Sequence, residues 1–489
     1  MAAADHNPHV QHIIQLGLVP YFIRCLKENN AEMQVEAAWA LTNVSAGTTE
    51  ETEVVVEQGA IPALVDIIKK DKGSLREQAI WAVGNIAAEK QFRDLLIARG
   101  ALNLLLETLQ DENTGLSTTR IGTWALANFC RTVFPKDKSG DLVDLVMQVS
   151  ISLLSQRDKD TIVDSVWTLS SIAGWDSSYT DRIVAAGVVP HLIHLLRQRH
   201  TSILHPTLRC LASVAMGPDA DTQEMMSCGV VPRLKQLLMG RQKKRVLGNL
   251  CWALANMMGC GWSMCQVVID AGIIPLVMGV LKHGIYEVKK EAAFVVINAF
   301  NSDSIPYQGV IQLSNDGCIE ALCGFLTWEQ PRIVAHALEA LEAALKMGEL
   351  GRMNNGCNGS MLMNDSYEMT EKAHKKRVRA RGFHGRSNRI ACQVSAADGR
   401  ETLRQLTEHE CNDVASMAKE LLGKYFQVDG EAFEGDDVSE VMEDGEDAGQ
   451  LSTNGHGSAS SAAEELQGML EDWSVSERGP AKPPVTCAK

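Results

Sequence analysis

The sequence predicts an all-α fold, a right-handed superhelical solenoid of stacked helical repeats with a concave groove on its inner side. Two periodic motifs support this prediction. The first reads Trp-x-x-x-(Asn or Ser), and its copies in adjacent repeats are 42 or 43 residues apart. The second reads Gly-apolar-apolar-Pro and recurs in phase with the first. A fixed period of about 40 residues is the signature of helical repeat proteins.

The order of helices within one repeat follows from the Gly–Pro motif. Gly ends a helix in the left-handed conformation, and Pro fits the first turn of the next helix. Each copy therefore predicts a corner between two helices, and clear copies begin at Gly17, Gly59, Gly187, Gly229 and Gly272. After the corner come an apolar helix, a polar break and the Trp-bearing helix. Two or three helices in this period are typical of the armadillo or HEAT class.

The Trp-bearing helix carries, beside its apolar face, a second face that presents Trp and Asn. At about 100° per residue, Trp39 and Asn43 share an arc beside the apolar arc that contains Leu41. The motif copies begin at Trp39, Trp81, Trp124, Trp167 and Trp252, and Arg209 and Phe294 hold the same position in two other repeats. One copy alone is best explained by a core Trp and a capping Asn. Repetition favours a ligand surface, because an unsatisfied buried amide costs about 1–3 kcal/mol.

A ladder of Trp and Asn has the chemistry to grip an extended, Lys/Arg-rich peptide. The Asn amide both donates and accepts, so it can pair with a peptide backbone without reading its sequence. A Lys or Arg stem buried between indoles gains cation–π attraction of about 0.5–2 kcal/mol. Carboxylates expected near these slots would select cations; they belong to Glu36, Glu89, Asp164 and Glu291.

Composition narrows the functional classes. The chain has 489 residues and a formal net charge of −15. Residues 429–489 hold 15 acidic and 3 basic residues, a net charge of −12, and this composition is typical of a disordered acidic tail. Thirteen cysteines without zinc-like spacing predict reduced thiols and no metal or other cofactor. The sequence contains no enzyme motif such as a P-loop, GxSxG or HExxH, so we expect no enzyme activity, and no apolar run long enough to span a membrane.

Longer segments carry a specific family resemblance. They include EAAWALTNVSAGTTEET, REQAIWAVGNIAAE, TWALANFCR, HPTLRCLASVAMG, VKKEAAFVVINA and, near the end, DGRETLRQLTEHECNDVASMAKELLGKYF. At these residues the sequence resembles importin-α, the armadillo-repeat adaptor that recognises classical nuclear localisation signals. The resemblance covers about residues 7–426 with one interruption. It implies a non-enzymatic nuclear import adaptor that shuttles between cytoplasm and nucleus and needs no direct contact with nucleic acid or membrane.

The resemblance also implies two peptide-binding sites. The major site would comprise Trp39, Asn43, Gly47, Thr52, Gln78, Trp81, Asn85, Glu89, Trp124, Asn128, Asp164 and Trp167. The minor site would comprise Arg209, Trp252, Asn256, Glu291, Phe294 and Asn298. This sequence departs from the family pattern at Ala46, Glu89, Ser171, Ser213, Asn249 and Phe294. Because Asn249 offers no negative charge, we expect bipartite signals to gain less from the minor site than the family suggests.

The resemblance further predicts domains and partners. We expect armadillo repeats over 1–350, about nine in all with the first truncated, a disordered basic insertion at 351–387, a last repeat at 388–427 and an acidic disordered tail at 428–489. The last repeat corresponds to the family's site for its recycling exportin. Family members begin with a basic arm that binds importin-β. That arm is absent from this sequence, which fits either a truncated gene model or an arm-less paralogue and leaves importin-β without an evident binding site.

Two further interpretations stay open. Lys376-Arg377-Val378-Arg379, within the insertion, has the form of a nuclear localisation signal; it suits a solvated loop or, as a sharper hypothesis, an internal pseudo-ligand that competes for the groove. For the whole chain, the alternatives to a nuclear import adaptor are an armadillo scaffold for other protein partners and a degenerate, arm-less importin-α relative that binds cargo without importin-β.

Overall fold

The computed structural model describes residues 10–135, 140–302, 304–357 and 388–426. Every regular element within these ranges is an α-helix, which confirms the predicted fold class. The chain divides between Arg233 and Leu234 into two compact units. Unit 1 holds the described residues before this point, and unit 2 holds those after it.

In most repeats of unit 1, two short helices precede a longer third helix. Its helices are α1 (Val10–Gln15), α2 (Val19–Cys25), α3 (Ala31–Ser45), α4 (Thr49–Glu57), α5 (Ala60–Lys70), α6 (Ser74–Ile86), α7 (Lys90–Ala98), α8 (Ala101–Gln110), α9 (Leu116–Phe129), α10 (Asp141–Leu153), α11 (Lys159–Ala173), α12 (Ser177–Ala185), α13 (Val188–Leu195), α14 (Thr201–Val214), α15 (Asp219–Ser227) and the start of α16 (Val230–Met239).

Unit 2 repeats the same pattern. Its helices are the rest of α16, then α17 (Lys244–Met258), α18 (Trp262–Asp270), α19 (Ile274–His283), α20 (Tyr286–Asn301), α21 (Tyr307–Asn315), α22 (Cys318–Phe325), α23 (Pro331–Cys357), α25 (Arg389–Ala396), α26 (Gly399–Leu406) and α27 (Asn412–Tyr425).

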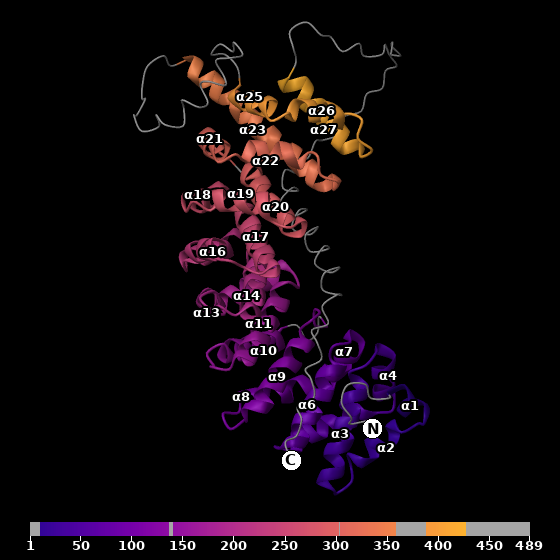
Figure 1. The fold of residues 1–489 in the computed structure, drawn as a ribbon. Helices are drawn as coiled ribbons and strands as arrows, with labels where there is room; N and C mark the ends of the chain where they lie inside the picture. Colours follow the sequence, from indigo (N-terminus) through magenta and orange to yellow (C-terminus); the bar gives the residue numbers. More distant parts are fainter. Residues whose placement is uncertain (1–9, 136–139, 303, 358–387, 427–489) are drawn as a thin grey trace, which may run out of the picture. The chain divides into compact units, whose positions relative to one another are not determined.

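The predicted corners and the predicted stacking are both present. Gly59 and Gly187 adopt φ values of +81° and +76° at the start of α5 and α13, a region that glycine enters without steric cost. In unit 1 the long third helices pack side by side in the order α3, α6, α9, α11 and α14 (Figure 1). In unit 2 the order is α17, α20, α23 and α27. One repeat departs from the pattern, because the single helix α10 stands where the other repeats have two short helices.

The end of α23 differs from the expected boundary. This helix is 27 residues long and continues to Cys357, into the segment predicted to interrupt the repeats. The helix packs closely on its neighbours on either side of the expected boundary: a Cβ on Gly348 would lie 2.1 Å from Oδ1 of Asn388, and one on Gly351 would lie 2.2 Å from Cε2 of Tyr307. The rest of the predicted insertion, 358–387 with its basic sequence, and the predicted tail lie outside the described residues.

The described helices also bear on the cysteine and membrane predictions. Eleven described cysteines are free thiols. Burial raises the pKa of Cys210 and Cys251 to about 12, so both thiols stay protonated. No single described helix has the length and apolar composition to cross a membrane, and the bent pair α18 and α19 meets that test by length and composition only.

A candidate peptide-binding ladder

The four predicted Trp residues of unit 1 lie on consecutive third helices. Trp39 is on α3, Trp81 on α6, Trp124 on α9 and Trp167 on α11, and each side chain is half-buried. The helices that carry them pack directly on one another. The structure therefore brings these residues into one row, which we call the Trp–Asn ladder together with Asn43, Asn85 and Asn128.

Two Asn residues of the ladder tie consecutive repeats together. Asn85 Nδ2 donates to the carbonyl of Thr42 at 3.0 Å, and Asn128 Nδ2 donates to the carbonyl of Gly84, also at 3.0 Å. Each accepting residue immediately precedes the Asn of the previous repeat. Within the described residues, the side chains of Asn85 and Asn128 make no other hydrogen bond. A half-buried amide held in this way keeps one N–H and its Oδ1 for a ligand.

We call the Trp and Asn of one repeat a rung of the ladder. A close contact at Gly84 places the third rung, Trp124 and Asn128, against the helix of the second rung, α6. A Cβ on Gly84 would lie 2.6 Å from Cζ3 of Trp124 and 2.9 Å from the Cβ of Ala125. Only glycine leaves room for this indole on α6. Sequence reasoning missed Gly84, although it was visible as the single Gly inside a Trp-x-x-x-Asn motif of the ladder.

The other predicted residues of the major site occupy varied positions. Asp164 is half-buried on α11, three residues before Trp167, and Glu89 is the N-cap residue of α7. Gln78, on α6, has a buried Oε1 without a hydrogen-bond partner. Gly47 is exposed at the corner after α3, where a Cβ would clash with the Glu51 carboxylate.

Thr52 does not fit the expectation of a ligand-facing residue. It is 2% exposed, and its hydroxyl donates to the carbonyls of Ser45 and Thr48 at 3.2 and 3.1 Å. The bond to Ser45 fastens α4 to the end of α3. The physical reason is that a hydroxyl at this corner satisfies the Ser45 carbonyl, which the end of α3 leaves open.

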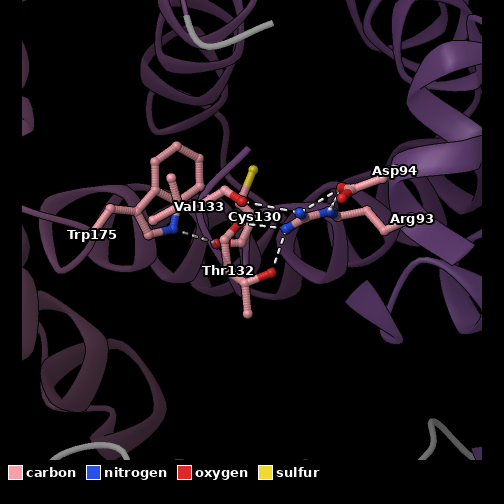
Figure 2. A network of polar contacts seen from close by, with 6 residues as sticks. All are labelled: Arg93, Asp94, Cys130, Thr132, Val133 and Trp175. Atoms are coloured by element: carbon pink, nitrogen blue, oxygen red, sulfur yellow. Dashed lines mark hydrogen bonds and ion pairs between the residues drawn. The ribbon is translucent and has the colours of Figure 1, made fainter. Parts of the chain in front are cut away.

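A buried polar clamp holds the C-terminal end of α9, the helix of the third rung (Figure 2). Arg93, on α7, is 1% exposed and donates to the carbonyls of Thr132 and Val133 at 2.5 and 2.9 Å. Its guanidinium also binds Asp94 Oδ1 at 2.6 Å. From the other side, Trp175 Nε1 donates to the Cys130 carbonyl at 3.1 Å.

The clamp thus satisfies three carbonyls just after α9 that no helical N–H can reach. The rings of Phe134 and Trp175, 5.0 Å apart, pack beside it. No periodic signal pointed to Arg93 or Trp175. Their role is to fix α9, and with it Trp124 and Asn128.

In unit 2 the predicted minor-site residues are more enclosed. Trp252 and Asn256, on α17, are 4% and 8% exposed, although their motif is identical to that of Trp124 and Asn128. Trp252 Nε1 and Glu291 Oε2 are buried without a hydrogen-bond partner. Burial raises the pKa of Glu291, on α20, to about 7, while the nearby Lys290 opposes the shift.

The row of unit 2 nevertheless shares the inter-repeat bond. Asn298 Nδ2, on α20, donates to the carbonyl of Ala255 at 2.8 Å. Phe294 is half-buried, and its ring centroid lies 6.0 Å from that of His336, which holds the next rung on α23. Arg209, the remaining predicted residue of the minor site, lies on α14 in unit 1. Among the described residues, no group of three His, Cys, Asp or Glu side chains is placed to hold a metal ion.

The comparisons with known proteins first define the class. The Armadillo/beta-catenin-like repeat family matches residues 6–46, 48–88, 176–216 and 218–259. An engineered protein of known crystal structure shares the fold, with a TM-score of 0.71 and 22% identity, over 86% of this chain and 92% of that one. The chain is therefore an armadillo-repeat protein.

The curated relatives define the family. Importin subunit alpha-5 of Arabidopsis thaliana is 40% identical over 75% of this chain and 70% of its own length. Importin subunit alpha-3 of the same species is 33% identical over 91% of this chain and 78% of its own length, and importin subunit alpha-1b of Oryza sativa subsp. japonica is 31% identical over 87% and 74%. This chain belongs to the importin subunit alpha family, the armadillo-repeat adaptors of nuclear protein import.

Proposed function

We propose that this chain binds the Lys/Arg-rich nuclear localisation signals of cargo proteins along the Trp–Asn ladder of unit 1. The observation that carries the proposal is the row of four half-buried Trp side chains interleaved with Asn amides, of which those of Asn85 and Asn128 have an anchored Nδ2. An anchored amide meets a peptide backbone with little loss of side-chain entropy. Family membership supports the same function.

The charges beside the ladder suit a cationic peptide. Glu36 is exposed on α3, three residues before Trp39, and Asp164 holds the same position before Trp167. A Lys or Arg head between two rungs would lie within reach of these carboxylates, while its methylene stem covers the indoles at about 0.8 kcal/mol per buried CH₂. A sequence-tolerant backbone grip combined with selective slots is what binding of many different basic signals requires.

The finer partners are part of the proposal. We infer that importin-β acts with this chain in transport through the nuclear pore, that a recycling exportin binds the last repeat around Arg400–Phe426, and that the protein shuttles between cytoplasm and nucleus. Membership of the importin subunit alpha family supports the import role and an importin-β partnership in general, and the exportin role rests on the resemblance of the last repeat alone.

The test is a calorimetric titration of the full chain with a peptide of the Lys-(Lys/Arg)-x-(Lys/Arg) form. The wild-type chain should bind it, and Trp81→Ala should weaken binding about tenfold, since a rung loses both buried methylenes and cation–π attraction. An acidic peptide of equal length is the control. Tight binding of the acidic peptide instead would indicate an armadillo scaffold for other partners.

A further inference from the structure

One edge of unit 2 concentrates positive charge at the start of its third helices. Arg241, Lys243, Lys244 and Arg245 form the corner between α16 and α17, and all four side chains are exposed. The first turn of α17 contains no acidic residue. Cations in the first turn of a helix oppose its dipole, so folding does not favour this cluster. A charge pattern that works against local stability is better explained by a ligand.

The next corner, between α19 and α20, adds cations and exposed apolar groups. Lys282 is exposed there, and Ile285 and Tyr286 are 46% and 45% exposed. Lys290 Nζ lies 5.6 Å from the centroid of the Tyr286 ring, and the Trp328 ring packs against the same ring at 5.6 Å with a tilt of 49°. Residues 239–245 and 282–290 together hold seven Lys or Arg and a single acid, Glu287.

Helix register brings the two corners side by side. Helices α17 and α20 pack along their length, and the bond from Asn298 to Ala255 joins residues 43 positions apart. Tyr286 follows Lys243 by the same 43 positions, so the starts of the two helices are neighbours, with axes about 8–10 Å apart. We call this surface the basic edge: Met239, Arg241, Lys243, Lys244, Arg245, Lys282, Ile285 and Tyr286.

The apolar members of the basic edge indicate the kind of ligand. Met239 is 69% exposed at the end of α16, beside the cations of the first corner. A nucleic acid would use the cations and stack on Tyr286, but it would give Met239 and Ile285 no role. An acidic polypeptide with interspersed apolar residues matches both components of the surface.

We propose that the basic edge binds residues 429–447 of this same chain. That segment contains ten Asp and Glu residues and no Lys or Arg, and its apolar residues are Ala432, Phe433, Val438, Val441 and Met442. No other stretch of this length in the sequence has this charge, and it follows directly on unit 2, whose last helix, α27, ends at Tyr425.

The reach from α27 to the basic edge is compatible with this assignment. Helix α27 packs on α23, α23 on α20 and α20 on α17, so the path along the stack is about 20–30 Å. Crossing from the end of a third helix to its start adds about 21 Å for 14 residues. The diagonal of about 37 Å needs about 11 extended residues. Residues from Asp436 onward can therefore lie on the basic edge.

Zero-length carbodiimide cross-linking of the full chain at low salt, read by mass spectrometry, tests the proposal. Lys243, Lys244 and Lys282 should cross-link to carboxylates between Asp436 and Asp447. The double variant R241E/R245E keeps these reactive amines, and its cross-link yield should fall about fivefold or more. The matched control K69E/R199E reverses two exposed cations of unit 1 and should leave the yield unchanged.

A second variant leaves every described residue intact. Val441→Ser with Met442→Ser keeps all ten carboxylates but removes apolar contacts, and it should also lower the yield. Equal yields in wild type, R241E/R245E and K69E/R199E would overturn the proposal. So would cross-links that join isotopically heavy and light chains in a mixed sample, which would identify a second copy as the occupant. Tight binding of a single-stranded oligonucleotide that R241E/R245E abolishes would reassign the basic edge to nucleic acid.

Discussion

Replacing Asn85 by Ala separates the structural and the ligand-binding roles of the ladder. The change removes the 3.0 Å bond to the Thr42 carbonyl. That carbonyl also accepts from Ser45 Oγ at 3.1 Å, so it is not left without a partner, and the stability lost should be the net value of one hydrogen bond, about 0.5–1.5 kcal/mol. For a unit of this size, the melting temperature should fall by about 1–6 °C.

The effect on peptide binding should be larger than the effect on stability. If the amide makes two bonds to a peptide backbone, its loss costs about 1–3 kcal/mol, which is a Kd about 5- to 150-fold weaker. The assay is calorimetric titration with a monopartite basic peptide, well below the melting transition, so that partial unfolding does not contribute.

Asn298→Ala supplies the matched control. Asn298 makes the same inter-repeat bond, at 2.8 Å to the Ala255 carbonyl, but on α20 in unit 2. It should lower the melting temperature by a similar amount and leave the affinity of the monopartite peptide unchanged. If both variants weaken binding of the peptide equally, or if neither does, the Asn amides of unit 1 only connect the repeats, and our reasoning about the ladder is refuted.

Burial raises the pKa of Glu291 to about 7, so the protonated side chain stabilises the fold fully below its usual pKa of 4.5, and this stabilisation is lost as the pH rises through 7. The melting temperature of the wild type should therefore fall more between pH 5 and pH 8 than that of Glu291→Gln. Arg93→Met strands the carbonyls of Thr132 and Val133 and should cost about 3 kcal/mol in chemical denaturation, whereas the exposed Arg99→Met should cost less than about 0.5 kcal/mol. With Trp252 only 4% exposed, a bipartite signal should bind less than about 100-fold tighter than its monopartite half in calorimetry, and a larger gain would contradict this interpretation of unit 2.

Local chemistry explains which parts of the fold could be predicted from the sequence. Gly59 and Gly187 mark corners because glycine, which has no Cβ, adopts the left-handed conformation without steric cost. The Trp-bearing helices were equally accessible, because helical periodicity is written in contiguous residues. In contrast, the single helix α10 stands where other repeats have two helices, and its stretch of sequence lacks the Gly–Pro motif. The missing motif did not indicate which structure would take the place of the two helices.

The site could be predicted only in part, because exposure is set by neighbours that a motif does not contain. The sequence Trp-Ala-Leu-Ala-Asn occurs at Trp124 and at Trp252, yet the first indole is half-buried and the second is buried. Arg93 and Trp175 were missed for a related reason. Their partners are backbone carbonyls about 40 residues away, and such acceptors have no side-chain signature.

The bond from Asn85 to Thr42 also changes how the repeated Asn should be explained. A capping Asn and a peptide-gripping Asn were opposed interpretations, and the repetition of the motif favoured the second. In the structure the Nδ2 atom serves the repeat stack, while the rest of the same amide is available to a ligand. Anchoring one atom fixes the orientation of the amide, and a fixed amide loses less entropy when a peptide binds.

The inter-repeat bond of the Asn side chain therefore supports the proposed function and does not compete with it. It also predicts where the ladder should weaken. Ser171 and Ser213 replace the amide with a shorter hydroxyl, which loses the tie between repeats and the backbone grip together. A basic peptide should consequently be held by the rungs from Trp39 to Asn128, and a survey of Ala substitutions by calorimetry should find no comparable loss of affinity at Ser171 or Ser213.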